Sequence, residues 1–292
     1  MDLGGTKTEA IALGDDGRTL ARRRVVSPRD DYPATLETLV ALVAEVEREA
    51  AARGSVGVGV PGAISPAAGV LKNANSTWLN GQPLREDLER RLGRPVRLAN
   101  DANCFALSEA KDGAGAGARV VFGVILGTGT GGGVVVDGQV LSGPNAIAGE
   151  WGHNALPRPQ GNEWPGPRCY CGRTGCVELF LSGPGLERDH RERTGGSLEA
   201  AAIGRGAEAG DAACRQTLEV YADRLARGLA MVMNVLDPDV IVLGGGLSNL
   251  GHLYARVPEL WPAYVFSDRV DTRLLPPKHG ASSGVRGAAW LW

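Results

Sequence analysis

Apolar residues follow two different spacings along the chain, and the two spacings predict different elements. Short runs that are mainly apolar predict strands in a sheet. These runs lie at residues 8–13, 55–60, 96–99, 120–126 and 239–243. Longer stretches with apolar residues every three or four positions predict helices over 33–53, 83–92 and 212–236. Strands that alternate with helices in this way favour an α/β fold.

Two glycine-rich turns repeat one plan about half a chain apart. Residues 2–7 read Asp-Leu-Gly-Gly-Thr-Lys and residues 127–133 read Gly-Thr-Gly-Thr-Gly-Gly-Gly, each followed by a strand and an Asp-Gly turn. Such turns offer backbone N–H groups, hydroxyls and, at Lys7, a cation to phosphate. One copy alone is also compatible with a plain hairpin. The pair favours a duplicated fold with a nucleotide between its halves.

A third glycine turn, at 244–249, follows the buried strand 239–243 and could hold a base or a ribose against bare backbone. The alternative is a structural turn between a strand and a helix, but the two phosphate turns favour the nucleotide. Asp2 could also hold magnesium, directly or through water. The candidate ATP contacts are Asp2, Gly4, Gly5, Thr6, Lys7, Gly127, Thr128, Gly129, Thr130, Gly244, Gly245, Gly246 and Asn249.

Polar side chains that suit a sugar follow the strand 96–99 and also occupy the loop 73–80. Asn100 and Asp101 stand between that strand and a helix predicted over 104–110. A carboxylate there lies at the carboxyl edge of the sheet, where α/β active sites form, although capping the helix is the commoner role of such an Asp. Asn75 and Trp78 combine an amide with an aromatic ring, as carbohydrate sites do, and a plain surface loop is the alternative.

One histidine and three of the five cysteines form a metal-binding pattern. Cys169, Cys171 and Cys176 lie within eight residues of one another, with His153 upstream. Three sulfurs and one nitrogen form a closed tetrahedral zinc set, so we expect structural zinc at these four residues. Two glutamates, Glu150 and Glu178, flank the ligands. Either the metal only staples a long loop, or it also holds these carboxylates in a polar binding site.

Composition limits the class of protein. The 292 residues are enough for two domains, and 43% hydrophobic with 22% charged residues is typical of a soluble globular protein. A net charge of −2 provides no broad basic field for nucleic acid or an anionic membrane. We find neither a signal peptide nor an apolar run of the ~20 residues that a membrane span needs. Isolated Cys104 and Cys214 argue against a disulfide framework, so we expect a cytoplasmic protein.

Together these motifs resemble the ROK family of sugar kinases, within the actin/hexokinase-like (ribonuclease H-like) superfamily, over essentially the whole chain. The resemblance implies a duplicated α/β fold of two lobes with a central cleft. Residues 1–112 plus 280–292 would form a small lobe, and 113–279 a large lobe with the zinc loop. It also implies Mg-ATP as co-substrate and a homodimer.

By matching motif, Asp101 would be the base that accepts the proton of the primary 6-hydroxyl of the sugar. The other sugar contacts would be Asn75, Asn100, Glu150, His153 and Glu178. His153 would bind zinc through one ring nitrogen and the sugar through the other, so that the metal fixes its orientation.

The segments 73–81 and 282–290 resemble those of bacterial fructokinases that also act on mannose, which makes fructose the expected substrate. The same motifs suit a kinase for glucose or N-acetylglucosamine. The family also contains sugar-responsive transcriptional regulators, which carry a winged-helix domain ahead of this fold. We expect no such domain, because the fold starts at residue 1, and Asp101 further disfavours a regulator or a non-catalytic binder.

Two positions depart from the family pattern. Only Met1 precedes Asp2, so either the first strand is unusually short or the true start lies upstream. Because this strand is expected in the middle of the sheet, its shortening would weaken the nucleotide-binding lobe. Ala281 stands where close relatives tend to carry an acidic residue after His-Gly, and we assign it no effect.

Overall fold

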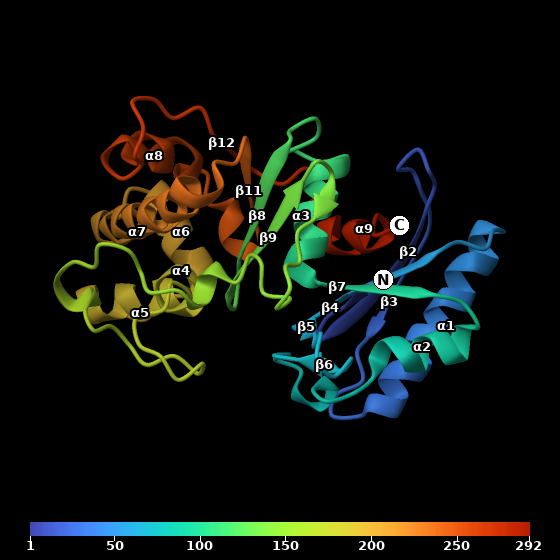
Figure 1. The fold of residues 1–292 in the computed structure, drawn as a ribbon. Coiled ribbons are helices and arrows are strands. Elements are labelled where there is room, and N and C mark those ends of the chain that lie inside the picture. The colour runs from blue at the N-terminus through green and yellow to red at the C-terminus, as the bar shows by residue number, and fades with distance from the viewer. The chain divides into compact units, whose positions relative to one another are not determined.

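The structure is a computed structural model that describes residues 1–280 and 282–292, so Ala281 lies outside the described residues. The chain forms two compact units (Figure 1). The first unit comprises Met1–Gly117, Gly133–Ala148 and Ala281–Trp292, and the second comprises Ala118–Gly132 and Gly149–Gly280. Residues 133–148, which we had placed in the large lobe, therefore group with the first unit. The reason is close packing, since a Cβ on Gly133 would lie 2.5 Å from the carbonyl oxygen of Ala102.

The first unit is built on a five-stranded sheet with the order β3-β2-β1-β4-β7. Its strands are β1 (Asp2–Leu3), β2 (Lys7–Leu13), β3 (Thr19–Val26), β4 (Val56–Val60) and β7 (Val96–Asn100). β1, β4 and β7 pair in parallel, while β2 and β3 form an antiparallel hairpin at one edge. The short first strand does lie in the middle of this sheet. A small second sheet pairs β5 (Ala63–Ile64) with β6 (Leu71–Lys72).

Four helices cover the two faces of this sheet (Figure 1). α1 (Tyr32–Ala50) and α2 (Leu84–Leu92) pack on one face, and α3 (Asp101–Lys111) and α9 (Ser283–Ala289) on the other. α1 buries Leu36, Leu39 and Val43, the stripe that its apolar spacing predicts. α9 can approach α3 only because residue 287 is glycine. A Cβ there would lie 1.6 Å from the carbonyl oxygen of Cys104.

The second sheet repeats the first, with the order β10-β9-β8-β11-β12. Its strands are β8 (Val120–Leu126), β9 (Thr130–Val136), β10 (Gln139–Val140), β11 (Val240–Gly244) and β12 (Arg273–Leu275). β11 pairs in parallel with β8 and β12, and β9 pairs with β10 as an antiparallel hairpin. In both sheets the first three strands stand in reverse order before two parallel ones. This repetition confirms the duplication that the paired glycine turns predicted.

Helices gather around α7 (Ala212–Leu236) in the second unit (Figure 1). They are α4 (Glu178–Leu181), α5 (Gly183–Thr194), α6 (Ala200–Glu208) and α8 (His252–Leu260). α7 spans the predicted residues. Its N-cap is Asp211, whose side chain accepts the N–H of Cys214 at 2.8 Å. Short 3-10 turns complete the chain at η1 (Thr77–Leu79), η2 (Trp151–His153), η3 (Gly161–Glu163), η4 (Gly246–Asn249), η5 (Trp261–Ala263) and η6 (Gly280–Ser282).

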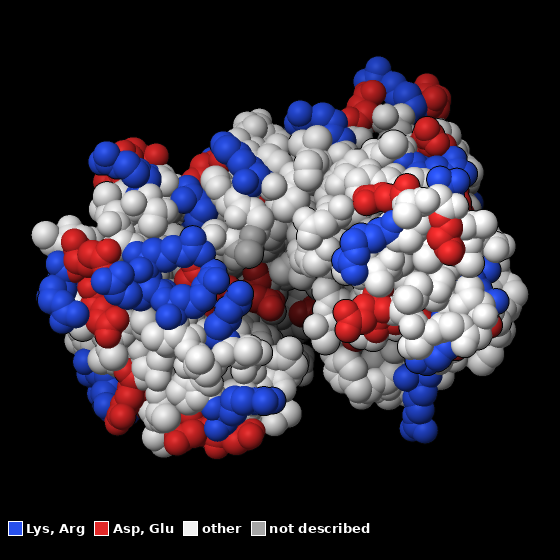
Figure 2. Space-filling view, turned by 180° about the vertical axis from the view of Figure 1, so that it is seen from behind, with Lys and Arg blue, Asp and Glu red and all other residues white. Residues whose placement is uncertain are grey.

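The surface that Figure 2 shows carries acidic and basic side chains next to one another, in keeping with the net charge of −2. One basic row comes from β3, where Arg22 and Arg24 both pair with Glu9 of the neighbouring strand. Among the described residues, no helix combines the length and the apolar character that crossing a membrane requires.

Candidate functional site

The four predicted zinc ligands meet at one point of the second unit. Their donor atoms, on His153, Cys169, Cys171 and Cys176, all lie within 4.8 Å of one another. Cys171 Sγ lies 3.6 Å from Cys176 Sγ, and Cys169 Sγ lies 3.7 Å from His153 Nδ1. Donors of a tetrahedral zinc ion with Zn–S bonds of about 2.3 Å are about 3.8 Å apart. The cluster therefore fits a zinc ion that is bound through Nδ1 of the imidazole.

Local backbone pairing brings these ligands together. A tight turn returns the chain at Gly172, where φ is +88°, and Cys169 donates its N–H to Arg173 at 2.7 Å. An isolated bridge between Ala155 and Cys176 places the segment after His153 beside the last cysteine. Burial raises the pKa of Cys176 to about 12. Backbone hydrogen bonding at Arg173, the largest influence, lowers the pKa of Cys171 to about 7. A bound cation would favour the thiolate form of all three cysteines, because its positive charge offsets their mutual repulsion.

A buried ion-pair cluster, which sequence reasoning missed, anchors the loop between His153 and the cysteines. Glu163 accepts hydrogen bonds from Arg224 at 2.7 Å and from Arg227 at 2.9 Å, and all three side chains are at most 5% exposed. Arg227 also donates to the carbonyl oxygens of Pro157 and Arg158. Burial would raise the pKa of Glu163, but the hydrogen bonds from Arg227 and Arg224 outweigh it and lower the pKa. In the sequence, this cluster is indicated only by the two arginines on the otherwise apolar face of α7.

His153 also faces an aromatic neighbour. Its Nε2 lies 3.0 Å from the hydroxyl of Tyr170, and the two rings meet edge to face with centroids 5.2 Å apart. Of the predicted sugar contacts, His153 thus lies against Tyr170.

The second glycine turn is linked to this cluster through Glu178. Its Oε2 accepts the backbone N–H of Thr130 at 3.0 Å. Within the turn, Gly127 donates its N–H to Gly129 at 3.0 Å and accepts the N–H of Gly183 at 2.7 Å. The Thr130 hydroxyl is buried and has no hydrogen-bond partner among the described residues. Short backbone turns with an unpaired hydroxyl fit a phosphate group, whose oxygens accept hydrogen bonds.

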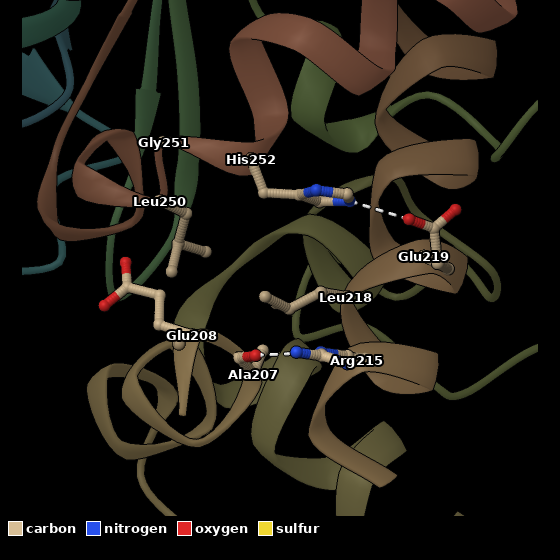
Figure 3. Close-up of a pocket in the computed structure, with 9 residues that line it drawn as sticks. Ala207, Glu208, Arg215, Leu218, Glu219, Leu250, Gly251 and His252 are labelled. Carbon is tan, nitrogen blue, oxygen red and sulfur yellow. Dashed lines mark hydrogen bonds and ion pairs between the residues drawn. The ribbon is translucent and has the colours of Figure 1, made fainter. Parts of the chain in front are cut away.

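The third glycine turn leads directly into a pocket of about 440 Å³ (Figure 3). Gly245 adopts φ +79°, and a Cβ there would lie 2.4 Å from the carbonyl oxygen of Leu126, so only glycine fits. The pocket mixes apolar and charged side chains from α6, α7 and the start of α8. It is lined by Gly204, Ala207, Glu208, Arg215, Leu218, Glu219, Leu250, Gly251 and His252. His252 lies 2.8 Å from Glu219 across one wall (Figure 3).

In the first unit, Asp101 is exposed and opens α3 at the carboxyl end of β7. Its Oδ1 accepts the N–H of Ala102 at 2.8 Å, and Asn100 Oδ1 accepts the same N–H at 2.9 Å. Asn100 Nδ2 donates to the carbonyl oxygen of Gly62 at 3.0 Å, which ties the neighbouring loop to this corner. Asn100 is thus the N-cap of α3, whereas Asp101 is the first residue of the helix and keeps an exposed carboxylate.

The first glycine turn lies at the same sheet edge as Asp101. β4 separates β1 from β7, so the turn and Asp101 stand two strand spacings, about 10 Å, apart. Gly4 donates its N–H to Lys7 at 3.1 Å. Burial raises the pKa of Asp2, and the same burial lowers the pKa of the Met1 amino group to about 6. Asn75 is exposed in the loop that follows β6. Asn80 holds this loop through two hydrogen bonds between its side-chain amide and the backbone of Ala74.

Comparison with known proteins identifies the family of this chain. The model of the ROK family matches residues 1–292. An N-acetyl-D-glucosamine kinase of Vibrio vulnificus is 41% identical over 295 residues, which cover 100% of this chain and 97% of the relative.

Solved structures of two ROK proteins have the same fold as this chain. A ROK hexokinase from Thermus thermophilus superimposes with a TM-score of 0.87 at 34% identity, covering 99% of this chain and 95% of that one. A ROK family glucokinase from Streptomyces griseus, solved with glucose and AMPPNP, gives 0.80 at 27% identity over 99% and 96%. The fold is thus of the actin/hexokinase-like type. The relatives support a hexose kinase, but they favour N-acetylglucosamine over the fructose that the segments 73–81 and 282–290 suggested.

Proposed function

This chain belongs to the ROK family, and we propose that it is an ATP-dependent kinase that phosphorylates the primary 6-hydroxyl of N-acetyl-D-glucosamine. The observation that carries the proposal is the 41% identity to an N-acetyl-D-glucosamine kinase over the whole of this chain. The geometry within each unit supplies the parts that such a kinase needs. These are an exposed carboxylate at a sheet edge, glycine turns for phosphate, and a metal-braced cluster of carboxylates and imidazole.

Asp101 is the proposed base. Its exposed carboxylate, held by the first turn of α3, would accept the proton of the 6-hydroxyl as that oxygen attacks the γ-phosphorus of ATP. The bond from the γ-phosphorus to the β,γ-bridging oxygen breaks, and ADP leaves. Asn100 steadies this corner and keeps a second lone pair on Oδ1 for a sugar hydroxyl.

The remaining sugar contacts are proposed to be Asn75, Glu150, His153 and Glu178. Carboxylates accept hydrogen bonds from sugar hydroxyls, and the imidazole Nε2–H donates one. Zinc on Nδ1 would leave the proton on Nε2 and lock the ring, so the metal orients His153 and takes no part in phosphoryl transfer.

ATP would lie with its phosphates on the glycine turns. The turns at residues 4–7 and 127–130 are the proposed phosphate contacts, and the unpaired Thr130 hydroxyl fits a phosphate oxygen. Magnesium would neutralise phosphate charge during transfer, with Asp2 as its proposed protein contact. We propose that the adenine enters the pocket beside the third turn, where Leu218 and Leu250 offer apolar surface and Glu208 and Arg215 offer polar groups.

A coupled ADP-release assay with N-acetyl-D-glucosamine, glucose, mannose and fructose tests the proposal. We expect the highest kcat/KM for N-acetyl-D-glucosamine. Highest kcat/KM for fructose would restore the interpretation drawn from residues 73–81 and 282–290. The absence of turnover with all four sugars, in zinc-loaded protein with Mg-ATP, would refute the proposed function.

A further inference from the structure

Tyr170 has no role in the site described so far, yet it touches the residue at the centre of that site. It stands between Cys169 and Cys171 at the tip of the metal-binding hairpin, and its side chain is 83% exposed. Both neighbours point their sulfurs into the metal cluster. The phenol turns instead toward His153, with its hydroxyl 3.0 Å from Nε2. Among the described residues, His153 is the side chain that Tyr170 contacts, so the exposed phenol does little to pack the hairpin.

The donor and acceptor in this contact follow from the metal. His153 Nδ1 faces Cys169 Sγ at 3.7 Å and is the nitrogen that fits zinc. Zinc on Nδ1 requires the proton of the neutral ring to lie on Nε2. Before a sugar binds, Nε2–H therefore donates to the Tyr170 oxygen, and a bound sugar shares this donor with the phenol. The hydroxyl proton of Tyr170 is then available to donate to a second acceptor.

We propose that Tyr170 is a sugar-contact residue that selects for an acetamido group on the substrate. The inference rests on the proposed function, which places a sugar substituent at His153 Nε2. The Tyr170 hydroxyl already occupies the neighbourhood of that nitrogen. A substituent bound by His153 must therefore lie against the phenol.

The chemistry of the phenol distinguishes an acetamido group from a hydroxyl. The acetamido carbonyl oxygen can accept the Tyr170 hydroxyl proton, and its methyl group can pack on the exposed ring face. A hydroxyl on the same sugar carbon is two bonds shorter and carries no methyl, so it gains neither contact. Tyr170 thus adds affinity for N-acetylhexosamines and little for glucose.

The test compares Tyr170→Phe and Tyr170→Ala with wild type in zinc-loaded protein. Calorimetry without ATP gives the Kd for N-acetyl-D-glucosamine and for glucose, and steady-state kinetics give both KM values and the KM for ATP. The matched control is Tyr32→Phe, because that hydroxyl also bonds a side chain, Asp87 at 2.7 Å, but belongs to α1 of the first unit.

We expect Tyr170→Phe to weaken N-acetyl-D-glucosamine binding about 3- to 10-fold, the worth of one hydrogen bond, and glucose binding less than about 2-fold. Tyr170→Ala should weaken N-acetyl-D-glucosamine binding by more than about 10-fold and leave the KM for ATP and the zinc content unchanged. If both variants weaken the binding of the two sugars equally, so that the ratio of the Kd values is unchanged, the proposal is overturned. Loss of zinc would overturn it too, and would assign Tyr170 to the metal site. Wild-type protein that phosphorylates neither sugar would instead refute the proposed function.

Discussion

Glu178 Oε2 accepts the backbone N–H of Thr130 at 3.0 Å, so a predicted sugar contact occupies a predicted phosphate-binding amide. A carboxylate in this place withholds one donor from a phosphate and repels its negative charge. If the sugar draws Glu178 away, the N–H of Thr130 becomes available to ATP. Sugar binding should therefore strengthen ATP binding within this unit.

Glu178→Gln tests this link. Removing the negative charge should tighten AMPPNP binding in the absence of sugar by about 3- to 10-fold and weaken sugar binding by at least as much. Calorimetry with and without N-acetyl-D-glucosamine measures both. Glu187→Gln is the matched control, since Glu187 also accepts one backbone N–H, that of Ala200 at 2.9 Å. AMPPNP affinity that stays unchanged in Glu178→Gln would contradict the link.

Asp101→Asn should fold normally and lose about 10²- to 10⁴-fold in kcat, the usual contribution of a general base. Asn100, the N-cap of α3, is unchanged in this variant, so the unfolding midpoint should move little. The control is Asp31→Asn, which changes an exposed carboxylate at the start of α1. Turnover near wild type in Asp101→Asn would remove this carboxylate from the mechanism.

Metal analysis of purified protein should find about one zinc ion per chain, held by three cysteines and one histidine. Cys171→Ser should abolish retention, because the hydroxyl does not ionise to replace a thiolate ligand. Cys214→Ala, which alters a buried cysteine on α7 outside the cluster, should keep its zinc. Full zinc content in Cys171→Ser would exclude Cys171 as a ligand.

Glu163→Gln should lower the free energy of unfolding at pH 7 by about 1–3 kcal/mol, because Arg224 and Arg227 lose their shared anion. Arg224 keeps its pair with Asp189, and Arg227 keeps its pair with Asp223. The folded-state pKa of Glu163 is lowered, so its contribution is present above the ordinary carboxyl pKa and is lost as the pH falls through the folded pKa. The difference in unfolding free energy between wild type and Glu163→Gln should therefore become smaller in acid. Denaturant titrations from pH 7 down to about pH 2 measure it.

The control for Glu163 is Glu259→Gln, which breaks an exposed pair with Arg256 and should change the free energy of unfolding far less. A Glu163→Gln protein as stable as wild type at pH 7 would show that the buried cluster adds nothing net. A difference that grows in acid would reverse the assigned pKa shift.

Gly251→Phe should raise the KM for ATP about tenfold or more and leave the KM for the sugar unchanged. Gly251 lines the pocket of Figure 3, and a Cβ there would meet no atom within 4 Å, so the substitution adds a ring without a clash at its base. Gly54→Phe, at an equally open glycine of the first unit, is the control. An unchanged KM for ATP would place the adenine elsewhere.

The sequence by itself determined the features whose chemistry is local. The glycine turns follow from backbone that only glycine allows, as at Gly245. The three cysteines lie within one short hairpin, so their spacing alone predicted a metal cluster. The helix over 212–236 follows from its apolar spacing and its Asp211 cap. By contrast β3 was not predicted, because its exposed arginines lack a strand pattern and it forms only by pairing with β2.

Only the tertiary structure decided the contacts between residues far apart in the chain. Glu163 meets Arg224 and Arg227 across more than sixty positions, and Glu178 meets Thr130 across 48. Tyr170 acquires a role only because the hairpin turns its phenol toward His153. Periodicity and motifs report the environment of each segment, but they carry no distance between segments. Such pairs are set by how helices and loops pack, which depends on the whole fold.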